Sequence, residues 1–140
     1  MNNNRTSAQP TNHGGTRHTG QHMAIDGPLK LNVQLLRGRE PAIGPGKALV
    51  LEAVDRTGSI SAAGRDLGMS YRRIWLLVHA LNCDWRETVV ETKAGGTNGA
   101  KLTAFGHMLL AHYRALEAAM LAAAPGPALD WMTRSIKPAD

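Results

Sequence analysis

The sequence contains a single cysteine and no long hydrophobic run, and both shortages limit the class of protein. Cys83 has no second cysteine with which to form an internal disulfide, which favours a reducing cytoplasm. No stretch approaches the roughly 18 consecutive apolar residues of a membrane-spanning helix, and the N-terminus lacks the apolar core of a secretion signal. We therefore expect a cytoplasmic protein that does not enter a membrane.

Motifs that perform catalysis or hold a metal are also missing. The sequence has no phosphate-binding GxxxxGK[ST], no zinc-binding HExxH and no cysteine pair. Cys83 stands alone at an expected helix end, where a cysteine is interpreted as a packing residue. His13, His18 and His22 lie in a polar segment without carboxylate or cysteine partners. We expect no enzyme activity, no cofactor and no metal site.

The net charge is positive but moderate. Sixteen Lys and Arg residues exceed eleven Asp and Glu residues, which leaves a net charge of +5. The 140 residues, 43% of them hydrophobic, suffice for one domain with a core and two tails. A charge of this size is compatible with a polyanionic partner such as nucleic acid, although many soluble proteins carry as much without binding one.

The stretch from Gly58 to Asn82, GSISAAGRDLGMSYRRIWLLVHALN, predicts two short helices joined by a tight turn. Ser59 and Ser70 are the expected N-caps, and Gly68 can adopt the left-handed conformation that ends the first helix. The expected inward stripe of the first helix consists of Ile60, Ala63 and Leu67. This arrangement is a helix-turn-helix, whose second helix lies in the DNA major groove.

A helical projection divides the second helix into a buried side and an outward side. The residues expected to be buried are Tyr71, Ile74, Trp75, Val78 and Leu81, and those expected to face outward are Arg72, Arg73, Leu76 and His79. An arginine near the start of a recognition helix can donate two hydrogen bonds to guanine or clamp a phosphate. An outward leucine needs an apolar cover, which a thymine methyl group can provide.

The chain before this stretch is expected to form an arm, a strand and a helix. Residues Met1 to Gly27 are rich in Asn, Thr, Gly, Gln and His, which predicts a disordered arm. Leu29 to Leu36 alternates apolar and polar residues, as a half-buried strand does, and its partner strand should lie elsewhere. Pro45 suits the entrance to a helix from about Lys47 to Arg56, which should pack under the helix-turn-helix. Its expected inward residues are Val50, Leu51 and Val54.

A β-hairpin is expected directly after the second helix. Val89 to Thr92 and Lys101-Leu102 are the predicted strands, and the tip contains Gly95, Gly96, Asn98 and Gly99. In this position a hairpin would form a wing, with Lys93, Lys101 and the backbone amides of the tip close to phosphates or the minor groove. The alternative is an ordinary surface hairpin.

Thr103 is the expected cap of a last long helix, from about Ala104 to Ala123. Five residues of this helix are spaced by four, three, four and three positions, as in a coiled-coil seam: Phe105, Leu109, His112, Leu116 and Ala119. The seam is either a dimer interface or a stripe that packs on helices of the same chain. We expect residues 28–123 to form the domain and the proline-rich residues 124–140 to form a flexible tail.

Two segments together resemble the N-terminal winged helix-turn-helix domain of the ModE family, the molybdate-responsive bacterial transcription regulators. They are TGSISAAGRDLGMSYRRIWLLVHALN and VVETKAGGTNGAKLTAFG. The pattern is more loosely similar to the DNA-binding domain of LysR-type regulators. The resemblance covers about Leu29 to Met120 and implies a mainly α fold with a small β wing and a long C-terminal helix. It also implies a homodimer, formed largely through the first and last helices, that binds a palindromic operator.

The resemblance implies where DNA would be contacted. By motif position, Ser59 and Ser61 would meet phosphates, the first turn of the second helix would meet base edges, and the wing would contribute Lys93 to Lys101. The full expected set is Ser59, Ser61, Ser70, Tyr71, Arg72, Arg73, Leu76, His79, Lys93, Thr97, Asn98 and Lys101. Tyr71 has two interpretations, because the projection places its ring in the core whereas its motif position could reach the DNA backbone.

The expected function is that of a sequence-specific transcription regulator that binds double-stranded DNA as a homodimer. Full-length members of the family continue into a separate domain that binds molybdate or tungstate, for which we expect no room in this chain. A separate sensor protein is therefore a candidate partner. The alternative functions are a protein-interaction module built on a winged helix and a non-specific DNA-binding protein.

Overall fold

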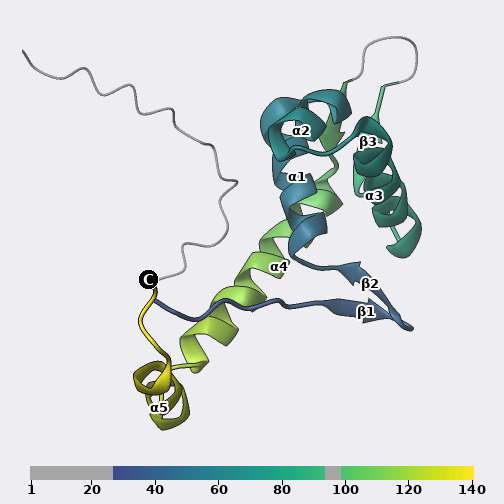
Figure 1. The fold of residues 1–140 in the computed structure, drawn as a ribbon. Helices are drawn as coiled ribbons and strands as arrows, with labels where there is room; N and C mark the ends of the chain where they lie inside the picture. Colours follow the sequence, from purple (N-terminus) through teal and green to yellow (C-terminus); the bar gives the residue numbers. More distant parts are fainter. Residues whose placement is uncertain (1–26, 94–98) are drawn as a thin grey trace, which may run out of the picture.

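The computed structural model describes residues 27–93 and 99–140 and contains nine helices and strands within them (Figure 1). They are β1 (Leu35–Arg37), β2 (Glu40–Ile43), α1 (Pro45–Thr57), α2 (Ile60–Leu67), α3 (Tyr71–Asp84), β3 (Val90–Thr92), β4 (Ala100–Leu102), α4 (Ala104–Ala123) and α5 (Pro127–Ser135). The strands form two antiparallel pairs, β1–β2 and β3–β4. The predicted mainly α fold with a small β wing is confirmed. The predictions for the arm, its histidines and the tip residues Gly95, Gly96, Thr97 and Asn98 lie outside the described residues.

Helix α1 lies at the centre of the domain, between the pair α2–α3 and helix α4 (Figure 1). The predicted inward residues Val50, Leu51 and Val54 are all fully buried. The helix begins two residues earlier than predicted, because Pro45 occupies its first turn, and Gly58 ends it in the left-handed conformation with φ 73°. None of the helices in the described part of the chain is long and apolar enough to cross a membrane.

The helix-turn-helix has the caps that the sequence predicts. The Ser59 hydroxyl accepts a hydrogen bond from the Ala62 N–H at 2.9 Å, and the Ser70 hydroxyl accepts one from the Arg73 N–H at 3.2 Å. Gly68 ends α2 with φ 66°. The turn folds back closely on α2, so that a Cβ at Gly64 would lie 3.0 Å from the Met69 carbonyl oxygen in the turn and 3.4 Å from the Ile74 Cγ2 of α3. The predicted stripe of α2 also holds, since Ile60 and Ala63 are buried and Leu67 is half-buried.

The strand predicted from Leu29 to Leu36 is wrong in both extent and partner. Regular pairing begins only at Leu35, and β1 pairs with β2 directly after it rather than with a distant strand. Leu29, Leu31 and Val33 do alternate with exposed neighbours. This alternation arises because the segment runs along α4 (Figure 1), where the Tyr113 hydroxyl donates to the Val33 carbonyl oxygen at 2.8 Å.

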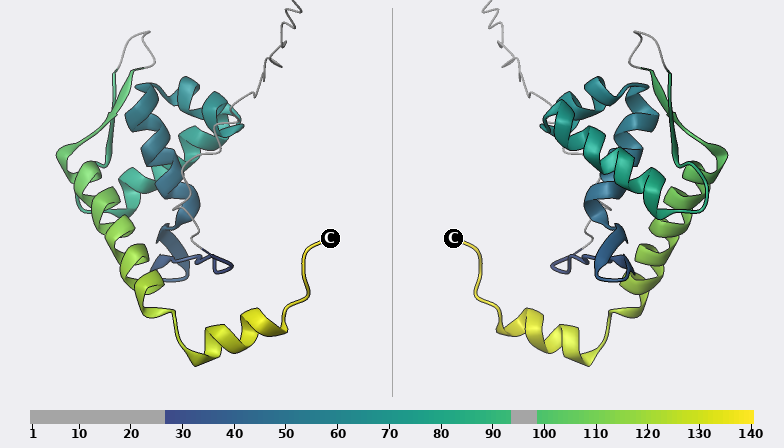
Figure 2. Two further views of the ribbon diagram at one scale, coloured as in Figure 1. Left: turned by 90° about the vertical axis from the view of Figure 1, so that its left-hand side faces the viewer. Right: turned by 90° about the vertical axis from the view of Figure 1, so that its right-hand side faces the viewer.

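Helix α4 has the predicted bounds, and the Thr103 hydroxyl caps it by accepting from the Gly106 N–H at 2.9 Å. Figure 2 shows the helix leading from the base of the wing to α5. The predicted seam is divided between two environments. Phe105 is half-buried and Leu109 is buried against the chain's own core, whereas His112, Leu116 and Ala119 are exposed. The inward face of α4 consists of Gly106, Leu109, Tyr113 and Glu117.

An ion-pair cluster ties α4 to α1. The Arg114 guanidinium donates to Glu52 of α1 at 2.7 Å and to the buried Glu117 at 2.6 Å. Burial by itself would lower the pKa of Arg114, but its hydrogen bonds to Glu117 and Glu52 outweigh that effect and raise the pKa. Burial, followed by the charge of Glu117, raises the pKa of Tyr113 to about 12. Arg114 and Tyr113 therefore keep their ordinary charge states at neutral pH.

The predicted flexible tail instead contains a helix, so that prediction is wrong for residues 127–135. Pro127 starts α5 rather than preventing it, because a proline fits the first turn of a helix. None of its residues is buried, and Trp131, Met132 and Ile136 are exposed at this end of the molecule. The domain boundaries themselves stay predictions.

The contact between α4 and the base of the wing generates a stability prediction. A Cβ at Gly106 would lie 2.2 Å from the Val89 carbonyl oxygen, a backbone atom that cannot move aside. We expect Gly106→Ala to lower the free energy of unfolding by about 2–3 kcal/mol in urea denaturation. Gly46→Ala is the matched control, because nothing lies within 4 Å of its added Cβ in α1. It should be neutral or stabilising by about 0.5 kcal/mol. Equal effects of the two substitutions would contradict the close approach at Gly106.

Candidate nucleic-acid interface

Helix α3 is anchored by a narrower apolar face than the projection predicted. Ile74, Val78 and Leu81 are buried, and Leu77 is half-buried and packs against them. Tyr71 and Trp75 were expected in the core but are 53% and 45% exposed. They flank the core face, which follows the regular spacing Ile74, Leu77, Val78 and Leu81. That spacing in the sequence would have identified the correct face, and the core interpretation of Tyr71 is wrong.

The outward side of α3 is the one that the sequence predicted. Arg72, Arg73, Leu76 and His79 are all exposed, and the apolar side chain of Leu76 is exposed to 49%. Within residues 27–93 and 99–140, neither Arg72 nor Arg73 forms an ion pair, whereas Arg37, Arg56 and Arg114 each do. The first turn of α3 also carries no acidic residue. Two uncompensated guanidinium groups are therefore presented at the start of this helix.

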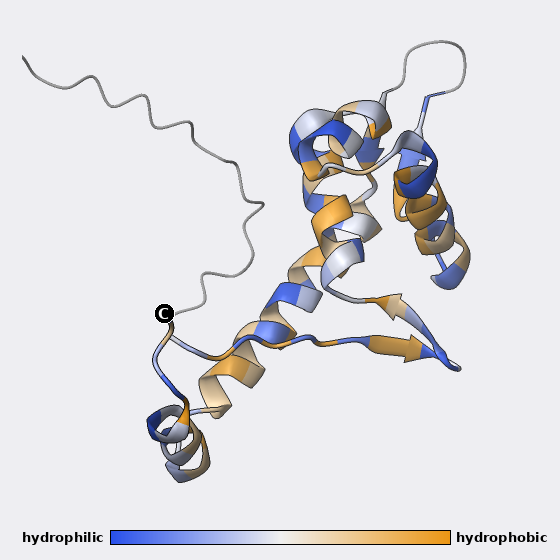
Figure 3. Cartoon of the chain, in the orientation of Figure 1, coloured by the Kyte–Doolittle hydropathy of each residue, from blue (hydrophilic) through white to orange (hydrophobic). Residues whose placement is uncertain are grey.

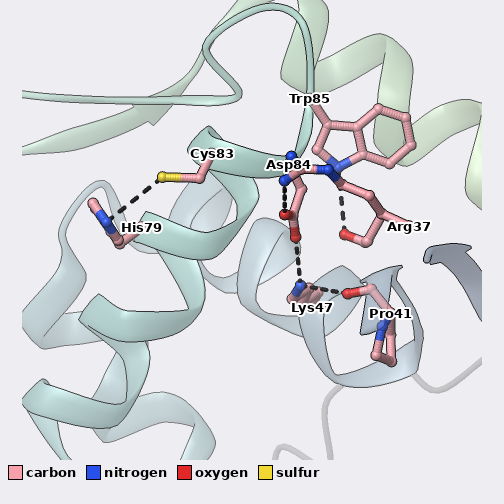
Figure 4. A network of polar contacts seen from close by, with 8 residues as sticks. Arg37, Pro41, Lys47, His79, Cys83, Asp84 and Trp85 are labelled. Atoms are coloured by element: carbon pink, nitrogen blue, oxygen red, sulfur yellow. Dashed lines mark hydrogen bonds and ion pairs between the residues drawn. The ribbon is translucent and has the colours of Figure 1, made fainter. Parts of the chain in front are cut away.

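Three side chains one turn apart continue the outward surface toward the end of α3. The Trp75 ring stacks on the His79 ring with centroids 5.2 Å apart and an interplanar angle of 6°. The Cys83 Sγ lies 3.6 Å from the His79 Nε2 (Figure 4). Cys83 is exposed, so its interpretation as a packing residue is wrong. Its position on the outward helix face, four residues after His79, is the sequence signal that could have placed it there.

The C-terminal end of α3 is held by a polar network (Figure 4). Asp84 accepts a hydrogen bond from Arg37 of β1 at 2.9 Å and one from Lys47 of α1 at 3.3 Å. Lys47 also donates to the Pro41 carbonyl oxygen at 2.6 Å. The hydrogen bond from Arg37 is the main reason that the pKa of Asp84 lies below its usual value, although burial opposes it. The network fixes one end of α3 and leaves the end with Arg72 and Arg73 projecting.

The expected wing is present as a hairpin. Val90, Glu91 and Thr92 pair with Leu102, Lys101 and Ala100 respectively. Lys93 and Lys101 are exposed, and their contact with DNA stays a prediction. The Lys101 Nζ lies 3.7 Å from a carboxylate oxygen of Glu91, an exposed pair that neutralises it only weakly. Thr97 and Asn98 lie outside the described residues.

The wing is joined to the corner between α1 and α2. The Ala100 N–H donates to the Gly58 carbonyl oxygen at 2.9 Å, and Ser59 and Gly99 form an isolated bridge. Ser59 and Ser61 are half-buried at this corner. The Ser59 oxygen is engaged as the helix cap, which leaves its O–H free of that role and able to donate.

The expected DNA-binding residues that the structure describes thus fall on neighbouring elements. Helices α2 and α3 and the wing lie at the end of the molecule opposite α5 (Figure 1). The expected dimer residues lie instead on α4, apart from the outward side of α3. A helix with exposed cations beside a hairpin with exposed lysines suits contact with a polyanion.

Comparisons with known proteins agree with the sequence resemblance. No family model matches the chain. The molybdenum-pterin-binding protein MopA of Rhodobacter capsulatus is 36% identical over 95 residues, which cover 66% of this chain and 36% of MopA. The molybdenum transport protein ModE of Azotobacter vinelandii is 39% identical over 49% of this chain and 26% of its own length. The transcriptional regulator ModE of Yersinia pestis is 34% identical over 49% of this chain and 27% of its own length. The chain therefore spans about a third or less of the length of these relatives.

Two solved structures of CbnR, a LysR-family transcriptional regulator, were also found. Its DNA-binding domain in complex with DNA is 29% identical with a TM-score of 0.46, over 56% of this chain and 87% of that one. The longer CbnR chain gives a TM-score of 0.45 at 29% identity, over 56% of this chain and 26% of that one.

The capped helix pair and the following wing are the features on which the sequence resemblance was based, and the structure contains both. The similarity to ModE and Mop proteins independently supports the same assignment. The chain contains a ModE-like winged helix-turn-helix domain.

Proposed function

We propose that this chain is a DNA-binding transcription regulator whose helix α3 enters the major groove of double-stranded DNA. The observation that carries the proposal is the pair of exposed arginines at the start of α3, Arg72 and Arg73, which have no acidic partner among the described residues. Burial of the opposite face fixes the orientation of α3, so an unpaired guanidinium on the exposed face is free to hydrogen-bond a guanine base edge or a phosphate. The name of the Yersinia pestis relative, a transcriptional regulator, supports the same function.

The remaining contacts are assigned by position. Exposed Tyr71, Leu76 and His79 lie on the groove-facing side of α3, where Leu76 can cover a thymine methyl group. Ser59, Ser61 and Ser70 are assigned to phosphates and nearby base edges at the two helix starts. The wing residues Lys93, Thr97, Asn98 and Lys101 are assigned to phosphates or the minor groove.

We further propose that the chain binds a palindromic operator as a homodimer. Helix α4 exposes the apolar side chains of Met108, Leu116 and Met120, beside His112 and Ala119. The part of α4 next to α5 consists mainly of hydrophobic residues (Figure 3). The proposed dimer contact does not include Phe105 and Leu109, because these two residues pack against the core of the same chain. An exposed apolar stripe on a long helix is stabilised when a second copy covers it.

Selection of bound genomic fragments with the purified protein at near-physiological salt tests the proposed function directly. An enriched inverted repeat, with half-sites about one helical turn or a multiple apart, is the expected result. Featureless and strongly salt-dependent binding would instead indicate a non-specific DNA-binding protein. No binding at all would favour a protein-interaction module.

The arginines on α3 generate a prediction about specificity. Arg72→Ala or Arg73→Ala should reduce the preference for the selected operator over scrambled DNA by about 1–3 kcal/mol if the lost contact is bidentate to guanine. Fluorescence anisotropy with the two duplexes measures this difference. Arg39→Ala, at an exposed arginine between β1 and β2, is the matched control and should leave the preference unchanged. If all three variants behaved alike, the role assigned to the start of α3 would be wrong.

The wing generates a prediction about affinity rather than specificity. Lys101→Ala should weaken binding to operator and scrambled DNA equally and reduce the slope of log affinity against log salt by about 1. Glu91→Gln is the matched variant, because it frees Lys101 from its carboxylate neighbour. It should leave binding unchanged or slightly tighter. A loss of operator preference in Lys101→Ala, with an unchanged salt slope, would count against a phosphate contact.

The exposed stripe of α4 generates a prediction about assembly. Leu116→Glu should shift the protein from dimer to monomer in sedimentation analysis and weaken operator binding at low protein concentration, because a charge would be buried in the contact. Ala118→Glu adds the same charge at another exposed position of α4 and should leave the dimer intact. A parent protein that sediments as a monomer at all concentrations would disprove the homodimer.

A further inference from the structure

Asn82, near the end of α3, is hydrogen-bonded to the first strand of the wing through both ends of its side-chain amide. Its Oδ1 accepts from the Val89 N–H at 2.9 Å and from the Val90 N–H at 3.0 Å. Its Nδ2 donates to the Val90 carbonyl oxygen at 3.0 Å. Among the described residues, these are the side-chain hydrogen bonds that connect α3 to β3 and to Val89 directly before it.

The register of the wing explains why the N–H and the carbonyl group of Val90 are free to bind Asn82. The Thr103 N–H donates to the Val89 carbonyl oxygen, and the Lys93 N–H donates to the Gly99 carbonyl oxygen. Because antiparallel strands alternate the direction of their backbone groups, the N–H and the carbonyl group of Val90 point away from β4. The amide of Asn82 therefore donates to and accepts from Val90 as the N–H and the carbonyl group of one residue in a third antiparallel strand would.

Asparagine suits this position better than residues of similar size. Aspartate could accept the two N–H bonds but could not donate to Val90, and its charge would face the carbonyl oxygen. Leucine would leave three backbone groups of Val89 and Val90 without partners, and these residues are only 0% and 2% exposed. The contact therefore requires one acceptor and one donor on the same short side chain.

We propose that Asn82 is a positioning residue for DNA binding, which holds the wing at the distance from α3 at which both elements reach one DNA duplex. Asn82 does so without touching the DNA, since its amide is engaged by Val89 and Val90. The second attachment of the wing, from Ala100 to Gly58, lies on the other strand and fixes it to the α1–α2 corner rather than to α3. This inference rests on the proposed function, in which α3 and the wing bind the same duplex.

A double-mutant cycle on operator affinity tests the inference. Alone, Lys101→Ala should weaken binding of the otherwise unaltered protein about fivefold. In the Asn82→Asp protein, where the donation to Val90 is lost and a negative charge repels the Val90 carbonyl oxygen, the wing is held less firmly and the same substitution should cost less than about twofold. Combining Asn82→Asp with Arg72→Ala is the matched control. These effects should multiply, because Arg72 lies on α3 and does not depend on the wing.

Two further measurements separate positioning from a general loss of stability. Amide hydrogen exchange should accelerate at Val89 and Val90 in Asn82→Leu, which removes the acceptor of both N–H groups, while the amides of Leu51 and Ile74 in the core stay protected. Asn82→Leu, which has no polar atoms, should show the same non-additivity with Lys101→Ala if it folds, as judged by its thermal unfolding.

The outcomes for the inference and for the proposed function are distinct. If the parent binds its operator and the Asn82 and Lys101 effects simply multiply, Asn82 is not a positioning residue and only this inference is overturned. If the parent binds no DNA, the proposed function fails and the inference falls with it. Equal coupling of Asn82 with Lys101 and with Arg72 would also overturn it, because it would indicate a change that is not specific to the wing.

Discussion

Burial of the apolar faces of α1 is the interaction on which the other elements depend. Val50, Leu51 and Val54 are removed from water by packing against the helix pair α2–α3, the wing and α4. Helices as short as α2 and α3 are marginal by themselves in water, so their stability comes from this shared core. The polar contacts orient the helices and the wing relative to one another, whereas apolar burial supplies the driving force for folding. Asp84 orients the end of α3, Asn82 joins α3 to the wing, and Arg114 links α1 to α4.

Local chemistry made much of this fold predictable. The caps at Ser59, Ser70 and Thr103 depend on a hydroxyl and the next turn of backbone, so the sequence alone located three helix starts. The borders of the buried face of α3 are less predictable. The exposure of Tyr71 and Trp75, which lie at these borders, depends on how far neighbouring helices extend over α3. Helix α5 is not predictable from the sequence, since it buries no residue and the prolines of residues 124–140 suggest a loose tail.

The candidate site shows the same division. The exposure of Arg72, Arg73, Leu76 and His79 followed from helical periodicity. The role of Asn82 could not be foreseen, because its partners Val89 and Val90 are presented to it only once β3 and β4 have paired in their observed register. The split of the α4 seam also depends on tertiary structure. Leu109 and Leu116 belong to the same spacing pattern. Leu109 packs in the chain's own core, whereas Leu116 lies beyond the end of that core and is exposed.

The exposure of Cys83 has a practical consequence. It is the only cysteine in the sequence, and it lies on the outward side of α3, one turn beyond His79. A thiol-directed fluorophore or spin label would therefore attach at one position without any engineered substitution. That position is on the helix assigned to the major groove, so the rate of labelling reports how accessible this helix is in the unaltered protein.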